Sequence, residues 1–237
     1  MKKLISIFCI IILSSCAELQ QVIDSLPQDS MGTVGLSNLD IANGLKEALD
    51  KGIDKQVSKL TQTDGFYKNE LVKIALPSEL TKVDKALRDI GLSSLADEGL
   101  KVLNRAAENA VKEATPIFVN AVKQMSFNDA KQILLGNNDA ATQYLKGTTS
   151  TELYGKFSPV IESSFSKVGA DKIWTNIINK YNSIPFTNNV NPDITDYVTG
   201  EALSGVYKMI AIEEGEIRTK LSSRTSDVLK KVFALQD

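Results

Sequence analysis

Residues 39–60, LDIANGLKEALDKGIDKQVSKL, contain the sequence pattern that decides the fold. Apolar side chains recur at every third or fourth position of this stretch, at Ile41, Leu45, Leu49, Ile53, Val57 and Leu60. Because an α-helix has 3.6 residues per turn, these side chains share one of its faces. The pattern predicts a long amphipathic helix at the start of the folded part of the chain.

Stripes of the same kind follow along the rest of the chain, and turn signals separate them. Gly91 ends one stripe, as is expected of a residue just beyond a helix C-terminus. Ser126 and Asp129 resemble a capping box, in which each side chain bonds to the backbone of the other residue. A short helical turn is expected at residues 70–76, where Pro77 ends it.

Two further signals shape the second half of the chain. Asp139 is expected to cap a short helix at residues 140–146, and Pro159 to kink or split the helix after it. No β-strand alternation of useful length and no fixed-period repeat occurs in the sequence. The predicted fold class is therefore all-α, a single compact domain of about eight to ten helices over residues 37–237.

The N-terminal segment has the pattern of a bacterial lipoprotein signal peptide. Two lysines precede a run at residues 4–13 that is apolar except for Ser6 and is too short to span a bilayer. The run leads into Leu-Ser-Ser-Cys at residues 13–16, which resembles the lipobox, where cleavage precedes an acylated cysteine. We therefore expect a cleaved signal peptide at residues 1–15, a lipidated Cys16, and a flexible tether over residues 16–36. An ordinary secretory signal with an incidental cysteine is the alternative.

The lipid on Cys16 is the expected contact with a membrane, because several acyl chains anchor a protein effectively permanently. No later apolar stretch reaches the roughly 18 residues of a spanning helix, so the body is expected to be anchored and not to cross. Ala17 and Glu18 are not the aspartate that retains lipoproteins in the inner membrane of some enterobacteria. The expected location is the bacterial cell envelope, with the outer membrane favoured over the inner one.

The composition argues against several classes of function. The 237 residues include 27 basic and 29 acidic side chains without a basic cluster, so no nucleic-acid partner is expected. Histidine is absent, which removes Ser-His-Asp and Cys-His catalysis and the histidine-based zinc and di-iron sites. Of the two cysteines, Cys9 leaves with the signal peptide and Cys16 carries lipid. No cofactor and no metal site are therefore expected.

Asn104, Arg105 and Glu108 form the first candidate polar site. They lie three or four positions apart, so they share one surface of a helix. At 100° per residue, Arg105 lies roughly 190° from the alanine stripe of the same segment, which favours a solvated ion pair. The alternative is a helix buried on both sides, where Arg105 must pair with an acid from another helix.

Tyr207, Glu214 and Arg218 form the second candidate group, at one edge of the apolar stripe of a later helix. Glu213 lies on the opposite flank of that stripe. Acids in such positions commonly form salt bridges at the boundary of the core. A hydrolase that uses paired carboxylates would instead need two acids in one cleft.

Residues 135–144, LGNNDAATQY, predict the end of one helix, a glycine stop and the N-terminus of another. Thr142, Gln143 and Tyr144 belong to the new helix and are candidate site residues. A helix N-terminus can bind an anion. Polar residues there also cap their own backbone.

Several short motifs resemble a single protein family. They are GLKEAL at 44–49, TDGF at 63–66, NRAAE at 104–108, AATQY at 140–144 and SRTSD at 223–227. In this order they are similar to an uncharacterised family of bacterial lipoproteins and exported proteins. The resemblance implies an exported helical domain and supplies no reaction, substrate or catalytic residue. It points to Asn104, Arg105, Glu108, the turn from Thr142 to Tyr144, and Arg224, either as a binding site or as a buried polar network that fixes helix register.

The expected function is that of a membrane-anchored envelope lipoprotein with a non-enzymatic helical domain for binding or scaffolding. Its expected partner is an envelope protein or a small or lipidic ligand held between helices. The alternative is a carboxylate-dependent hydrolase acting on an envelope component, with two of Glu108, Glu213 and Glu214 in one cleft. A third possibility is a purely structural domain without a pocket.

Overall fold

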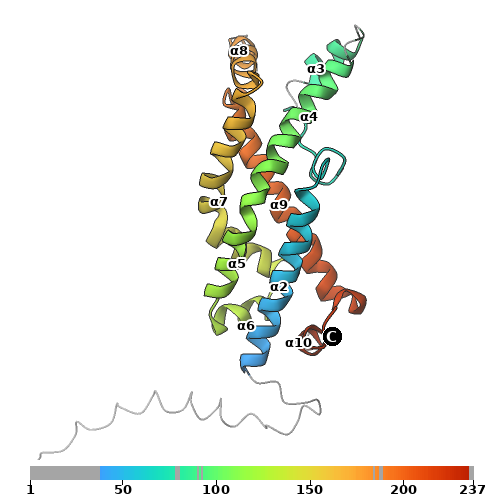
Figure 1. Cartoon of the computed structure of the whole chain (residues 1–237), viewed down its shortest axis with the longest axis vertical. Helices are drawn as coiled ribbons and strands as arrows, with labels where there is room; N and C mark the ends of the chain where they lie inside the picture. Colours follow the sequence, from blue (N-terminus) through green and yellow to red (C-terminus); the bar gives the residue numbers. More distant parts are fainter. Residues whose placement is uncertain are drawn as a thin grey trace, which may run out of the picture. The chain divides into compact units, whose positions relative to one another are not determined.

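The computed structural model describes residues 38–77, 81–89, 91, 93–183, 185–186 and 189–234. The expected signal peptide, the tether and the lipidated Cys16 lie outside these residues. Residues Leu36–Asp237 cluster as one compact unit. Figure 1 shows the described part of this unit as helices joined by mostly short connections.

The described part of the chain is built from α-helices, and none of its residues lies in a β-strand. In chain order the α-helices are α2 (Asn38–Leu60), α3 (Thr81–Asp89), α4 (Ser93–Ala110), α5 (Ala114–Gln124), α6 (Phe127–Leu135), α7 (Ala140–Ser166), α8 (Ala170–Asn182), α9 (Ile194–Thr219) and α10 (Asp227–Phe233). Two short 3₁₀ turns are η2 (Val111–Glu113) and η3 (Leu221–Ser223). The predicted all-α fold class is confirmed. Within the described ranges, no helix combines the length and the apolar character needed to cross a bilayer.

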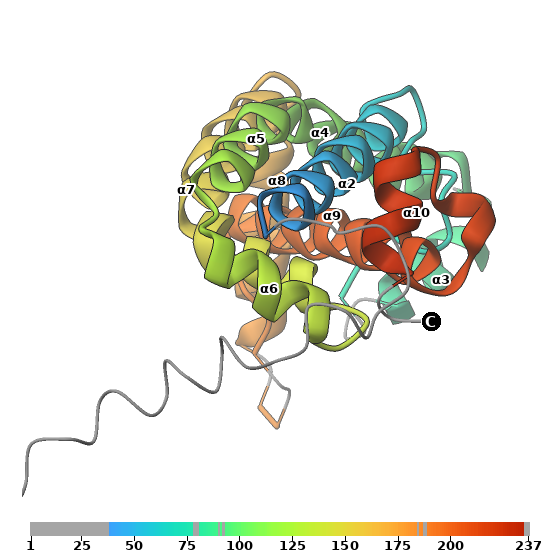
Figure 2. The ribbon, with the colours of Figure 1, turned by 90° about the horizontal axis from the view of Figure 1, so that it is seen from below.

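The long helices α2, α4, α7 and α9 form the centre of the packing. Helices α7 and α9 share the most extensive contact, and α9 also packs against α2 and α4. Helices α5, α6 and α10 contact α2 around its first turns (Figure 2). The apolar stripe predicted for α2 faces this core, because its members are buried at Leu45, Leu49, Ile53, Val57 and Leu60.

Small side chains on α4 let neighbouring helices approach closely. Ala107 and Ala110 are fully buried, and α4 packs against α7 and α9. Aromatic side chains fill the core beside them, and Phe118, Phe157 and Phe165 are fully buried. Each such phenylalanine stabilises the fold by roughly 1.5–3 kcal/mol.

Helix α7 differs from the expected pair of shorter helices, because it is continuous from Ala140 to Ser166 with Pro159 inside it. Of the two expected effects of Pro159, a kink or a split, the split does not occur. Proline removes one helical hydrogen bond, the bond to the carbonyl of Gly155 four residues earlier. Both residues are exposed, so water can bond to that carbonyl without a break in the helix.

The connection between α2 and α3 also differs from expectation. Residues 70–76 do not form a helix: hydrogen-bonded turns end at Val72, and the chain continues without regular structure to Pro77. Phe66, Val72 and Ile74 of this connection are buried. We call residues 61–77 the α2–α3 connection, and its buried backbone groups need partners from elsewhere in the fold.

Candidate functional site

Asn104 holds the α2–α3 connection against α4. It is fully buried. Its Oδ1 accepts a hydrogen bond of 2.8 Å from the backbone N–H of Ile74, and its Nδ2 donates to the Ile74 carbonyl at 2.9 Å. A third bond runs from Nδ2 to the carbonyl of Leu100, one turn earlier in α4. Three of the four hydrogen-bonding positions of this amide are thus used within the fold.

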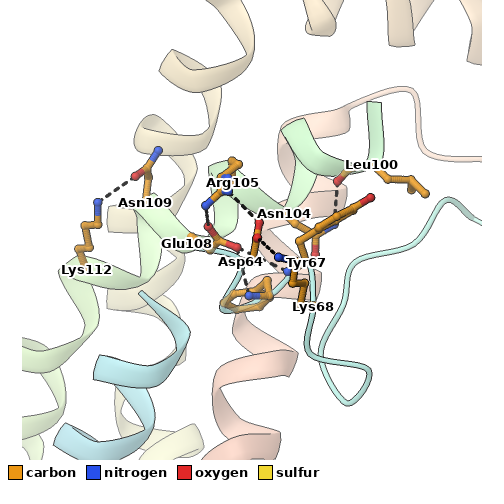
Figure 3. A network of polar contacts seen from close by, with 10 residues as sticks. Asp64, Tyr67, Lys68, Leu100, Asn104, Arg105, Glu108, Asn109 and Lys112 are labelled. Atoms are coloured by element: carbon orange, nitrogen blue, oxygen red, sulfur yellow. Dashed lines mark hydrogen bonds and ion pairs between the residues drawn. The ribbon is translucent and has the colours of Figure 1, made fainter. Parts of the chain in front are cut away.

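Glu108 and Arg105 hold the first part of the same connection (Figure 3). Oε1 of Glu108 accepts a bond of 3.1 Å from the backbone N–H of Phe66. Its Oε2 accepts a bond of 2.9 Å from Arg105, which also donates to Asp64 at 2.7 Å. The Glu108 side chain is 4% exposed and the Arg105 side chain 35% exposed. Neither expectation for Arg105 was complete, since it pairs within its own helix and also with an acid from a connection.

Asp64 is the member of this network that the sequence analysis did not single out as a site residue. Its pKa is lowered, chiefly by the hydrogen bond from Lys68 and also by the charge of Arg105. The backbone of Asp64 has a φ of 67°, in the left-handed region that aspartate tolerates better than most residues. The dipeptide Asp64-Gly65 is a turn signal, but it gives no indication that the carboxylate reaches α4.

Glu214 provides the cap at the start of α7. Its two carboxylate oxygens accept bonds of 2.8 Å from the backbone N–H groups of Ala141 and Thr142. The Thr142 hydroxyl donates to the same carboxylate. Asp139, the expected cap, makes no capping bond and instead accepts from the Gln143 side chain. A carboxylate at a helix N-terminus is stabilised by the N–H groups and by the helix dipole.

Arg218 and Arg224 bond to the carbonyl groups of nearby helix ends. Arg218 pairs with Glu214 at 2.8 Å and donates to the carbonyls of Ile133 and Leu134 at the end of α6. Arg224 donates to the carbonyls of two residues in the last turn of α9. Both arginines are buried. They satisfy carbonyl groups that have no partner inside their own helices.

Glu213 and Tyr207 are also bound within the fold. Glu213 accepts from Lys55 at 2.7 Å and from the Gln56 side chain at 2.6 Å, so it links α9 to α2. The Tyr207 hydroxyl lies 2.8 Å from the hydroxyl of Thr149 in α7. The expected edge group is thus divided: Tyr207 contacts α7 at Thr149, Glu214 contacts the start of α7, and Arg218 bonds to the end of α6.

The motif residues of the start of α7 also differ in their surroundings. Thr142 is buried, Gln143 is exposed, and Tyr144 is half-buried. Burial raises the pKa of the Tyr144 hydroxyl, and Asp129 adds to this. The fold therefore brings the candidate residues together at two places, the α2–α3 connection on α4 and the start of α7 beside the ends of α6 and α9.

Two open grooves border these networks in the described part of the chain. Thr142, Gln143 and Tyr207 line a groove of about 390 Å³ between α7 and α9. Arg105 lines a second groove of about 470 Å³ between α4 and the end of α7. A separate cavity lined by Glu213, Glu214 and Arg218 has a volume of about 20 Å³. That cavity has room for about one water molecule.

Metal-binding side chains do not gather in the residues that the structure describes. No group of three or more Asp, Glu, Cys or His side chains there is placed to hold an ion. Asp64, Glu108, Glu213 and Glu214 are instead paired with arginine, lysine or backbone N–H groups. Such pairing is typical of a polar network that stabilises a helical core.

Fold and site define an all-α domain whose buried polar side chains bind the ends and connections of its helices. The chain belongs to the family described as protein of unknown function (DUF4197), which matches residues 35–234. This agrees with the expected membership in an uncharacterised family. No curated protein and no solved structure matches the chain.

Proposed function

We propose that the protein is a lipid-anchored lipoprotein of the bacterial cell envelope whose helical domain is a non-enzymatic binding or scaffold module. The observation that carries this proposal is the set of hydrogen bonds that the polar motif residues make within the fold. Asn104, Glu108, Glu214 and Arg218 all bond to the backbone of other segments. Their role is to fix the positions of helices, which leaves the surfaces between the helices for a partner.

The same contacts argue against the carboxylate-dependent hydrolase. A general acid or base must reach a substrate proton. Glu108 pairs with Arg105, Glu214 with Arg218, and Glu213 with Lys55. All three glutamates are buried. An acid held this way contributes to the fold and does not have the access that catalysis requires.

A membrane anchor at Cys16 is the second part of the proposal, and it rests on the lipobox-like sequence at residues 13–16. We propose the outer membrane as the location, because Ala17 and Glu18 are not an inner-membrane retention signal. Cys16→Ala tests the anchor by cell fractionation and by metabolic labelling with palmitate. Loss of the label and of membrane association is expected. A variant that is still processed and still in the membrane fraction would show that the anchor proposal is wrong.

The non-enzymatic role is tested by separating stability from activity. Glu108→Gln and Glu213→Gln are compared with the parent chain for thermal stability and for hydrolysis of purified cell-envelope glycan. A structural role predicts a lower melting temperature for both variants and no hydrolysis by the parent chain. Hydrolysis by the parent that a stably folded variant has lost would instead establish the enzyme.

A further inference from the structure

The groove between α7 and α9 has the size and the lining of a small-molecule site. Its volume of about 390 Å³ lies within the roughly 300–1,000 Å³ typical of ligand pockets. Helix α7 contributes Gln143, Lys146 and Ser150. Helix α9 contributes Ser204 and Lys208, among others.

The charge of the groove differs from that of the chain. Two lysines line it, and none of its lining residues is acidic. The whole chain, in contrast, has a net charge of −2. Lys208 is held in place by a bond of 2.8 Å to the carbonyl of Leu71, which uses one of its three N–H donors. Lys146 is exposed. With two lysines and no acidic residue, the lining of the groove carries a positive charge, which favours an anion over a cation.

Hydroxyl and amide groups supply the remaining polar lining of the groove. The buried Tyr207 hydroxyl lies 2.8 Å from the Thr149 hydroxyl and 3.2 Å from that of Ser150. Both of these hydroxyls donate to carbonyls one turn earlier in α7. Tyr207 must therefore donate to one of them, which leaves its own oxygen able to accept. Donors and acceptors of this kind match the hydroxyl groups of a sugar or polyol.

Gly200 is part of the groove lining on the α9 side. Glycine inside a helix costs about 1 kcal/mol relative to alanine. No heavy atom lies within 4 Å of the position that a Cβ at Gly200 would take. Packing inside the domain therefore does not require glycine here, and a side chain added at this position would meet open space.

We propose that the α7–α9 groove binds a phosphorylated sugar or polyol, with the phosphate paired to Lys146 and Lys208. The hydroxyl groups of the ligand bond to the neighbouring hydroxyl and amide side chains. This inference rests on the proposed binding role of the helical domain and adds the site and the ligand class. A free sugar phosphate and the phosphoglycerol headgroup of a lipid share this chemistry.

The first experiment measures binding to the full chain, purified in a mild detergent, by isothermal titration calorimetry. The probes are glucose 6-phosphate, inorganic phosphate and uncharged glucose. We expect glucose 6-phosphate to bind more tightly than inorganic phosphate, and glucose not to bind. Lys146→Gln is expected to weaken binding about tenfold, the size of one lost charge-assisted contact. Lys156→Gln is the matched control, because Lys156 is exposed on α7 and does not line the groove.

The second variant blocks the groove without removing a charge. Gly200→Leu places a side chain in the open space and is expected to abolish binding while the domain stays folded. Gly155→Leu is its matched control, because Gly155 is also helical and open to solvent but lies outside the groove lining. A circular dichroism spectrum and a melting curve for each variant confirm that the fold is retained.

The two ligand sources are separated with phosphatidylglycerol and phosphatidylcholine vesicles. Binding to phosphatidylglycerol alone, weakened by Lys146→Gln, assigns a lipid headgroup. Binding of free glucose 6-phosphate assigns a soluble ligand. All measurements are repeated with Cys16→Ala, so that a failure of the anchor proposal does not obscure the result. The proposal is overturned if the parent chain binds neither glucose 6-phosphate nor phosphatidylglycerol vesicles. It is also overturned if Gly200→Leu and Lys146→Gln leave binding unchanged.

Discussion

Asn104 bonds to both backbone groups of Ile74, accepting from its N–H at 2.8 Å and donating to its carbonyl at 2.9 Å. One side-chain amide thereby supplies both the acceptor and the donor that the backbone of Ile74 needs, as a neighbouring β-strand would do for an edge strand. The backbone of residues 73–77 has no regular structure that could satisfy these groups within the segment. The asparagine at the first position of the NRAAE motif, Asn104, therefore has a structural role, which is to hold the α2–α3 connection.

Asn104→Ala is expected to lower the free energy of unfolding by about 3 kcal/mol. The substitution leaves the N–H and carbonyl of buried Ile74 without partners, and each unsatisfied group costs roughly 1–3 kcal/mol. Urea denaturation followed by circular dichroism measures the change. Asn109→Ala is the control, because Asn109 is exposed on the same helix. Equal stability of the two variants would show that Asn104 does not hold the connection.

Glu214→Gln is expected to destabilise the protein by about 3–5 kcal/mol. The change keeps the size of the side chain but leaves the buried guanidinium of Arg218 without its carboxylate partner. It also weakens the cap on the N-terminus of α7. Glu216→Gln provides the comparison, since its ion pair with Lys220 is exposed and such pairs contribute at most about 1 kcal/mol. Similar melting temperatures for both variants would contradict the assigned role of Glu214.

Gly44→Ala is expected to disturb the packing of α10 on α2. A Cβ at Gly44 would lie 2.7 Å from side-chain atoms of both Val228 and Val232. Overpacking of this kind costs roughly 1–3 kcal/mol. Gly147→Ala should act in the opposite sense, because Gly147 is helical with open space around it, and alanine there gains up to about 1 kcal/mol. Chemical denaturation compares the two, and a stabilising effect at Gly44 would argue against the α2–α10 contact.

Asp50→Asn is expected to stabilise the protein at pH 7 and to have no such effect at pH 3. Burial raises the pKa of Asp50 above its ordinary value of 3.8, although the charges of Lys123 and Lys46 act against this. The folded state therefore binds this proton more tightly than the unfolded chain does, so stability falls as pH rises above 3.8. The measurement is the urea midpoint at both pH values. Asp54→Asn, at an exposed position of α2, should leave the midpoint unchanged.

Local patterns were sufficient to predict much of the helical structure. The stripe on α2 is buried as predicted, and Ser126 and Asp129 form the predicted capping box. The hydrogen bonds from Ser126 also lower the pKa of Asp129. Each of these features depends on residues within one or two turns of each other, so spacing alone specifies it.

The candidate site could be predicted only in part. The motif comparison drew attention to Asn104, Glu108 and Thr142. All three are buried and hydrogen-bonded, and Thr142 bonds to Glu214. The partners of these residues were not predicted. Ile74 is an apolar residue that takes part through its backbone, and no side-chain pattern can identify a backbone partner.

The sequence by itself determined that this chain forms amphipathic helices with defined ends, because helix periodicity and capping are local properties. Tertiary structure decided which polar groups meet. Asp139 is next to the start of α7, yet the cap is Glu214, 73 positions from Ala141 in the chain. Contacts over such separations depend on how α9 packs against α7, and that packing arises from the whole apolar core. For the same reason, the groove between these two helices exists only in the folded domain.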